Sequence, residues 1–168
     1  MKLVARLSQL VVSKDNPSTF QTATRTAVAA IASYLVAWVF HLPQPYWAPI
    51  SSMVVVQPSM GASLPLSVQR LTGTALGAAA GAVAATYFPN SLWAFGIAVL
   101  SIGSLCAILR TERSAFRIAG ITLVIVMLIP QSAPVWVVAV HRSCEVSLGI
   151  AVGLLVSAVW PERPPKSR

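Results

Sequence analysis

The pattern of apolar and polar positions divides the chain into long apolar segments separated by short polar or proline-containing ones. Residues 26–69 and 71–109 contain no Asp, Glu, Lys or Arg. Each run is long enough for two transmembrane helices of about 20 residues, and each contains proline where a turn would lie. The pattern predicts an all-α membrane protein with six transmembrane helices, at about residues 18–40, 47–57, 64–88, 91–109, 114–129 and 135–160.

The second and fifth of these segments are short and end at prolines. At about 1.5 Å per residue, residues 47–57 do not cross about 30 Å of hydrocarbon as an ideal helix. Pro58 and Pro130 follow the two segments as helix breaks. Irregular backbone within a bilayer occurs only where protein or a wet cavity surrounds it. We therefore expect residues 57–63 to be irregular and to be surrounded by protein or by a wet cavity.

A shift of 72 residues aligns the two halves of the chain at arginine, proline and glycine positions. The aligned pairs are Arg70 with Arg142, Pro58 with Pro130, Pro89 with Pro161, Gly77 with Gly149, and Gly81 with Gly153. A composition rich in Ala, Gly and Val explains some of the glycine matches but not those of arginine and proline. The chain therefore resembles two copies of one three-helix unit, at about residues 18–89 and 90–161.

Each aligned arginine is followed by small residues at helical spacing. At about 100° per residue, the arginine and the glycines after it share one helix face, which a neighbouring helix can approach closely. The glycines are Gly73, Gly77 and Gly81 after Arg70, and Gly149 and Gly153 after Arg142. These glycine strips are typical of helix packing. The alternative is a functional site with the guanidinium at one end of the strip.

Positive residues lie at alternate ends of the predicted helices. They occur in residues 1–16, 110–117 and 162–168, and are absent from the turns at residues 41–46, 88–91 and 130–134. The positive-inside rule then places both termini in the cytoplasm. The second three-helix unit must cross the membrane in the opposite sense to the first, which is the inverted-repeat plan of many secondary transporters. We expect residues 1–16 to form an amphipathic interfacial segment, residues 17–161 the membrane domain and residues 162–168 a basic cytoplasmic tail.

Composition agrees with a membrane protein and restricts its partners. Charged residues make up 10% of the chain, whereas they make up about 25% of a soluble domain. The net charge of +8 would suggest nucleic acid in a soluble protein, but most of the basic residues lie at the ends of the predicted helices. We therefore expect membrane lipid and no nucleic acid as a partner. Cys106 and Cys144 lie within predicted helices, and the sequence holds no metal-ligand or cofactor motif. We expect no metal and no cofactor.

Two arginines and one acid are predicted to lie inside the membrane. Arg70 and Arg142 share faces with their glycine strips, so they turn toward other helices, where the guanidinium fork matches a carboxylate. Glu145 follows Arg142 by three residues on the same face. It is either the partner in a local ion pair that lets both charges enter the membrane, or a proton-coupling group. Arg25, in the first helix, is expected to snorkel toward the cytoplasmic surface rather than face the bundle interior.

Polar and aromatic side chains complete the candidate set. The polar residues expected to line a path are Ser51, Ser52, Gln57, Ser59 and Thr74. The aromatic residues Trp47 and Trp136 are interpreted as interface anchors rather than stacking platforms. His41 and His141 are interpreted as headgroup contacts.

Residues 47–59, followed by residues 69–77, resemble the signature of the fusaric-acid-resistance-like family, which includes aromatic acid exporters of bacteria. Residues 142–149, leading to Trp160 and Pro161, resemble the end of the same unit. Plant aluminium-activated malate channels are similar to this family in membrane fold. The resemblance implies export of organic anions, including aromatic carboxylates, across the bacterial inner membrane. Family members usually carry further cytoplasmic sequence and often a second membrane half, so we expect a transport path to need a homodimer of this chain.

Two functional classes agree with these patterns. The first is a transporter or channel for organic anions, supported by the predicted inverted repeats, broken helices and interior arginines. The second is a non-transporting membrane assembly or scaffold subunit that uses its glycine strips and basic surface to bind partners or anionic lipid. A membrane enzyme is not expected, because the sequence shows no nucleophile and base pair and no metal-ligand set.

Single cysteines introduced in the turns test the predicted topology. Cysteines at Gln44, Asn90 and Ser132 are expected to react with an impermeant thiol reagent added outside intact cells, because these turns face outward. A cysteine at Thr111 is expected to react only after the cells are opened. Labelling of residue 111 from outside would overturn the six-helix topology.

Overall fold

The computed structural model describes residues 20–89, 91–130 and 133–161, and these residues form six α-helices and no strand. The helices are α2 (Phe20–Val39), α3 (Trp47–Val55), α4 (Met60–Tyr87), α5 (Leu92–Ile108), α6 (Arg113–Leu128) and α7 (Val135–Val159). The prediction of an all-α protein is confirmed. The interfacial segment expected at residues 1–16 and the tail at residues 162–168 lie outside the described residues, so the domain boundaries stay predictions.

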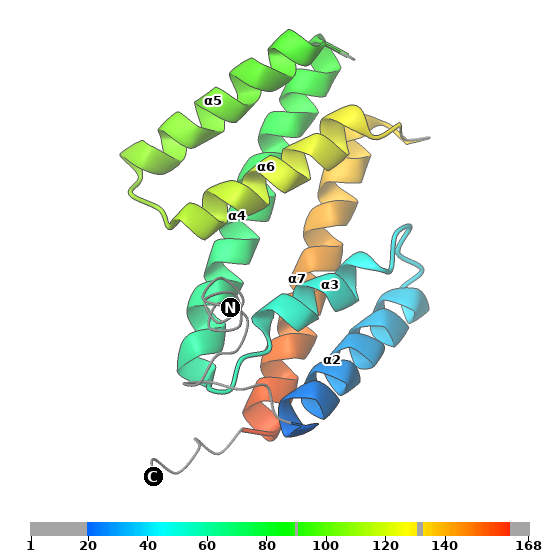
Figure 1. Ribbon diagram of the computed structural model, residues 1–168. Coiled ribbons are helices and arrows are strands. Elements are labelled where there is room, and N and C mark those ends of the chain that lie inside the picture. The colour runs from blue at the N-terminus through cyan, green and yellow to red at the C-terminus, as the bar shows by residue number, and fades with distance from the viewer. Residues whose placement is uncertain (1–19, 90, 131–132, 162–168) are drawn as a thin grey trace, which may run out of the picture.

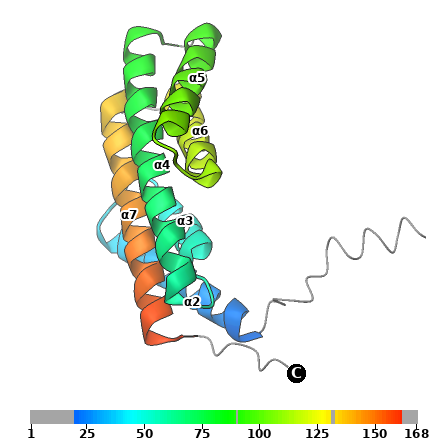
Figure 2. The same cartoon turned by 90° about the vertical axis from the view of Figure 1, so that its left-hand side faces the viewer.

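The two longest helices, α4 and α7, lie side by side through the middle of the molecule and run in opposite directions (Figure 1). α2 and α3 flank one end of this pair, and α5 and α6 flank the other (Figure 2). The contacts of the two halves correspond: α7 packs on α3 as α4 packs on α6, and α2 contacts α3 and α7 as α5 contacts α6 and α4. If α2, α3 and α4 are exchanged with α5, α6 and α7 respectively, every pair of contacting helices in the described chain maps onto another contacting pair.

The break between α3 and α4 is shorter than the sequence suggests. α3 ends at Val55, and Ser59 is the N-cap of α4. The Ser59 hydroxyl accepts a hydrogen bond at 3.3 Å from the backbone amide of Ala62. This cap satisfies one of the free amides of the first helical turn. α4 therefore begins at Met60, and residues 61–63, which were expected to be irregular, are helical.

Prolines mark both breaks. Pro58 lies between α3 and α4, and Pro130 follows α6. Ile129 is extended, with ψ of 123°, which is the conformation favoured before a proline. Proline also lacks the amide hydrogen that a continuing helix needs. The two short helices α3 and α6 therefore end near these residues.

The glycine strips lie where the two halves contact each other. A Cβ atom at Gly77 would overlap the backbone carbonyl of Ala119 in α6, and one at Gly149 would overlap the backbone carbonyl of Ala48 in α3. These helices are in backbone contact, which a larger residue would prevent. Because both strips pack within the chain, they do not support a contact between copies, and a homodimer stays a prediction.

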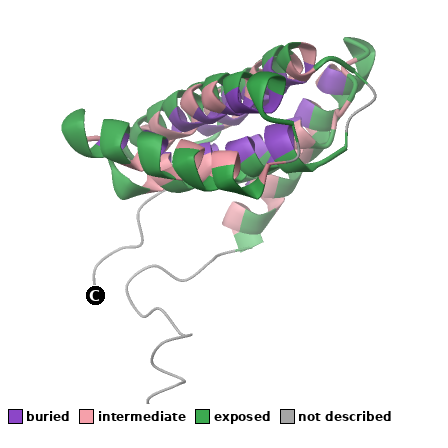
Figure 3. Cartoon of the chain, turned by 90° about the horizontal axis from the view of Figure 1, so that it is seen from above, coloured by how far each residue is buried: buried purple, intermediate pink, exposed green. Residues whose placement is uncertain are grey.

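Large apolar side chains are exposed on every helix, whereas the buried residues face the helix contacts (Figure 3). Soluble monomers rarely expose contiguous apolar patches above a few hundred Å², so this surface suits lipid. α2 and α7 are each long and apolar enough to cross a membrane, and α5 is a shorter apolar helix. Length and composition do not establish a crossing by the other helices, so the six-span topology stays a prediction.

The backbone contacts predict which glycines tolerate a side chain. Gly77→Ala and Gly149→Ala are each expected to lower the free energy of unfolding by about 1–3 kcal/mol, because the added methyl group must push two helices apart. Gly96→Ala in α5 is the control: nothing lies within 4 Å of its Cβ position, and alanine stabilises a helix interior by roughly 0.5–1 kcal/mol relative to glycine. Thermal unfolding in detergent measures all three. A Gly77→Ala variant as stable as the wild type would contradict the backbone contact.

Candidate functional site

Arg70 of α4 and Arg142 of α7 line the same interior pocket, although they lie 72 residues apart in the chain. Thr74 and Val146, one turn further along each helix, line this pocket as well. The 72-residue shift that aligns the two arginines also aligns Thr74 with Val146. The pocket therefore lies between equivalent positions of two antiparallel helices, where the two halves of the chain meet.

Several polar atoms around this arginine pocket are buried without a hydrogen-bond partner. They are both terminal nitrogens of Arg142, the Nε of Arg70 and the Oγ1 of Thr74. Arg142 is 3% exposed and Thr74 is 1% exposed, and buried polar groups in proteins are nearly always hydrogen-bonded. The pocket has a volume of about 30 Å³, which exceeds the minimum of about 10–15 Å³ that a cavity needs to hold a water molecule. It suits one water molecule or one small anionic group.

Arg142 stacks on Trp47 at the start of α3. The guanidinium carbon Cζ lies 3.4 Å from the centroid of the Trp47 ring, which is a cation–π contact. The expectation that Trp47 is not a stacking platform is therefore wrong, whereas its place at the membrane interface stays a prediction. The indole Nε1 donates a hydrogen bond at 3.0 Å to the side-chain oxygen of Gln44, which orients the ring within the turn between α2 and α3.

The carboxylate of Glu145 has a backbone partner instead of Arg142. Its Oε1 accepts a hydrogen bond at 2.9 Å from the amide of Gln44. Neither terminal nitrogen of Arg142 has a hydrogen-bond partner among the described residues, so the local ion pair expected from the sequence is not formed. Gln44 lies 101 positions before Glu145, so the spacing along α7 could not reveal this partner.

A second cavity, of about 200 Å³, also borders Arg142. Gln44, His141 and Glu145 contribute to its lining. Arg142 thus lies between this outer cavity, at the turn before α3, and the arginine pocket. His141 lines the outer cavity, whereas His41 is exposed in the turn after α2.

Most residues of the expected polar path do not line the arginine pocket. Ser51 and Ser52 are fully buried, and their hydroxyls donate to backbone carbonyls within α3 at 3.0 and 2.9 Å. Gln57 and Ser59 lie at the break, where the Gln57 amide donates to a serine hydroxyl at 3.2 Å and Ser59 caps α4. These side chains hold the helices in place. Thr74 alone of the five lines the pocket.

Arg25 lies inside the protein and not at the cytoplasmic surface. Its side chain is 0% exposed and donates hydrogen bonds to the carbonyl oxygens of Trp160, at 3.0 Å, and of Gln57. The prediction that Arg25 snorkels is therefore wrong. Carbonyls at a helix end lack intrahelical partners, and the end of α7 offers one to Arg25. No local signal marks this contact, because Trp160 lies 135 residues away.

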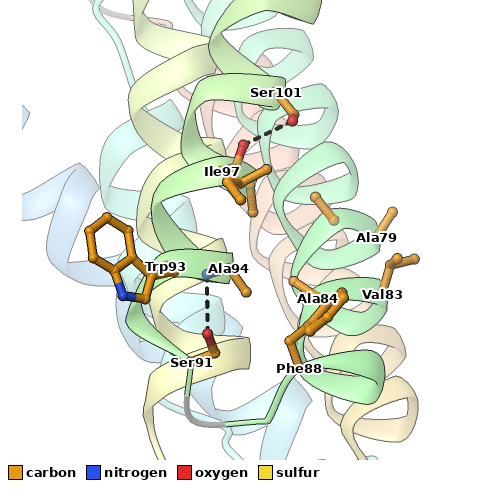
Figure 4. A pocket seen from close by; sticks show the side chains of 11 residues that line it. Ala79, Val83, Ala84, Phe88, Ser91, Trp93, Ala94, Ile97 and Ser101 are labelled. Atoms are coloured by element: carbon orange, nitrogen blue, oxygen red, sulfur yellow. Dashed lines mark hydrogen bonds between the residues drawn. The ribbon is translucent and has the colours of Figure 1, made fainter.

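An apolar groove of about 570 Å³ lies between α4 and α5 (Figure 4). The hydroxyls of Ser91 and Ser101 at this groove bond to the Ala94 amide and the Ile97 carbonyl of α5. The lining residues carry no charge, so the groove does not suit an anion. The groove lies between α4 of the first half and α5 of the second, and the equivalent helices are α7 and α2. The 72-residue shift aligns Arg25 of α2 with Ile97 of α5, so the position equivalent to this buried arginine is apolar and borders the groove.

Interior arginines between two related halves of a helical protein with an apolar surface are typical of membrane proteins that bind or move ions. The chain belongs to the fusaric acid resistance protein-like family, whose sequence model matches residues 17–156. The resemblance predicted from the sequence is confirmed.

Relatives in enteric bacteria are longer than this chain. The chain is 30% identical over 148 residues to the uncharacterized transporter YdhK of Escherichia coli (strain K12), covering 83% of this chain and 22% of that protein. It is 27% identical over 157 residues to YdhK of Salmonella typhimurium, and the match covers 88% of this chain and 23% of that protein. It is 28% identical over 147 residues to the inner membrane protein YeeA of Escherichia coli (strain K12), and the match covers 83% of this chain and 40% of that protein. No solved structure matches.

The buried contacts of Arg25 predict a large contribution to stability. Arg25→Ala is expected to lower the free energy of unfolding by roughly 3 kcal/mol or more, because each hydrogen bond to a charged group contributes about 1.5–3 kcal/mol. Arg117→Ala is the control, since Arg117 is exposed on α6 and such substitutions change stability by no more than about 0.5 kcal/mol. Unfolding in detergent measures both. Equal stability of the two variants would restore the snorkelling interpretation of Arg25.

Proposed function

We propose that this chain is the membrane unit of a transporter or channel for organic anions, in which Arg70 and Arg142 bind the carboxylate of the anion. The observation that carries this function is that both guanidinium groups border one interior pocket whose lining holds no acidic side chain. Like charges repel strongly in a medium of low dielectric constant, and buried charges need partners. An anion between the two arginines meets both requirements.

A carboxylate matches the arginine pocket in charge and in hydrogen bonding. A guanidinium offers a planar fork of N–H donors that binds a carboxylate through two parallel hydrogen bonds. Thr74 adds a buried hydroxyl that has no other partner. The arginine pocket, of about 30 Å³, has room for the acidic group alone, and Arg142 also lines the outer cavity, of about 200 Å³. We propose that the ring or chain of the anion occupies this outer cavity.

The proposal includes six crossings of the bacterial inner membrane, with inverted halves and both termini in the cytoplasm. The preserved helix contacts and the antiparallel α4 and α7 support the inversion. The positive residues gather in the segments proposed to be cytoplasmic, which supports the orientation. α3 has nine residues and is about 14 Å long at about 1.5 Å per residue. We therefore propose that α3 crosses the membrane together with the extended residues of the break.

The names of two relatives support the proposal of a membrane transporter. YdhK is described as an uncharacterized transporter and YeeA as an inner membrane protein. Fusaric acid, from which the family takes its description, is an aromatic carboxylic acid. This chemistry favours aromatic or other carboxylates as substrates, and resistance to such an acid favours efflux as the direction of transport. The proposal concerns this membrane unit and not the whole of those longer proteins.

Flux of benzoate through liposomes that contain only the purified protein tests the function. Arg70→Lys is expected to reduce the flux roughly tenfold, because lysine cannot make the bidentate contact and each 1.4 kcal/mol of lost binding is a factor of about ten. Arg117→Lys is the matched control and is expected to carry benzoate at the wild-type rate, because Arg117 is exposed on α6.

Two outcomes would count against this function. Folded wild-type protein that carries neither benzoate nor other carboxylates would contradict transport and favour the non-transporting assembly or scaffold subunit. Wild-type flux in Arg70→Lys would remove Arg70 from the anion site and leave its helix with a packing role.

A further inference from the structure

Arg142 and Glu145 lie close together and are buried, yet they do not bond to each other. They are three residues apart on α7, a spacing at which helix side chains are neighbours. Arg142 is 3% exposed and Glu145 is 1% exposed. Opposite charges attract strongly in a buried environment of low dielectric constant, so an ion pair between these two side chains would be the expected arrangement. Some other contact must hold the two side chains apart.

The turn between α2 and α3 supplies that contact. Its Gln44 amide donates to the Glu145 carboxylate at 2.9 Å, and the Gln44 side chain accepts from the Trp47 indole at 3.0 Å. The Trp47 ring in turn lies against the guanidinium of Arg142, 3.4 Å from Cζ to the ring centroid. One turn of the chain thus gives the acid and the base separate partners.

The stacking geometry determines which atoms of Arg142 stay available. At 3.4 Å from the ring centroid, Cζ is close enough only if the guanidinium lies with its flat face on the indole. Its N–H donors lie in the guanidinium plane and point outward from the edge. An ion pair with Glu145 would use those same N–H donors. The stacked arrangement leaves both terminal nitrogens of Arg142 without a partner, and Trp47 itself lines the arginine pocket.

We propose that Trp47 is a positioning residue for anion binding: it holds the guanidinium of Arg142 by its face and away from Glu145, so that the N–H donors bind the carboxylate of the ligand. This inference rests on the proposed function, because it assumes that the arginine pocket binds an anion. Without the indole, Arg142 turns toward Glu145, and the resulting ion pair neutralises the charge that attracts the anion.

Benzoate binding to the full chain in lipid nanodiscs, measured by calorimetry, tests this role. Trp47→Leu is expected to weaken benzoate binding roughly tenfold, equivalent to about 1.4 kcal/mol. Trp47→Phe keeps a ring against Arg142 and is expected to lose less. The double variant Trp47→Leu with Glu145→Gln removes the competing carboxylate and is expected to recover most of the wild-type affinity. Trp136→Leu, at an exposed tryptophan of α7, is the control and should bind as the wild type does.

The recovery in the double variant separates positioning from a purely structural role. If Trp47 only supported the fold, the second substitution would not restore affinity, and that result would overturn the inference. Wild-type affinity in Trp47→Leu would also overturn it, while leaving the proposed function intact. Failure of the wild type itself to bind or carry benzoate would instead reject the proposed function. If Trp47→Leu does not fold, Trp47→Phe replaces it, with a smaller loss that Glu145→Gln again reverses.

Discussion

Backbone contact at the glycine strips is the constraint on which the rest of the structure depends. The strip on α4 packs against α6, and the strip on α7 packs against α3, so each strip joins one half of the chain to the other. These two contacts bring α4 and α7 side by side in the middle of the molecule. The pocket between Arg70 and Arg142 follows from this arrangement, because the arginines lie on the same helices as the strips.

The buried charges have unusual partners because acidic residues are scarce. The chain has 12 basic residues and only 4 acidic ones, so most interior arginines cannot pair with a carboxylate. Arg25 bonds to carbonyl oxygens, Arg142 stacks on an indole, and Glu145, the one buried acid among the described residues, bonds to an amide. Burying an ion costs several kcal/mol unless other groups compensate. At Arg142 the compensation is incomplete, because neither terminal nitrogen has a hydrogen-bond partner among the described residues.

The two halves are equivalent at their contact and differ at their outer helices. Both arginines of the pocket, with Thr74 and Val146, occupy aligned positions. At the outer helices, Arg25 ties α2 to the end of α7, whereas the aligned Ile97 of α5 borders an apolar groove. The symmetry of the repeat is therefore kept where the proposed anion site lies and lost where each half meets its surroundings.

The sequence by itself determined the features that depend on local periodicity. The helices, the breaks at Pro58 and Pro130, and the aligned arginines are all visible in it, because helix formation and proline geometry act over a few residues. The family was visible as well, because each of the stretches that resemble it, residues 47–59, 69–77 and 142–149, can be read directly along the chain.

Only the tertiary structure decided which groups the buried charges contact. Spacing along α7 favoured an ion pair between Arg142 and Glu145, but their partners come from the turn at Gln44 and Trp47. The partner of Arg25 at the end of α7 is 135 residues away. A buried charge takes the most favourable polar group that folding brings within a few ångströms, and that choice depends on chain segments that local sequence does not relate.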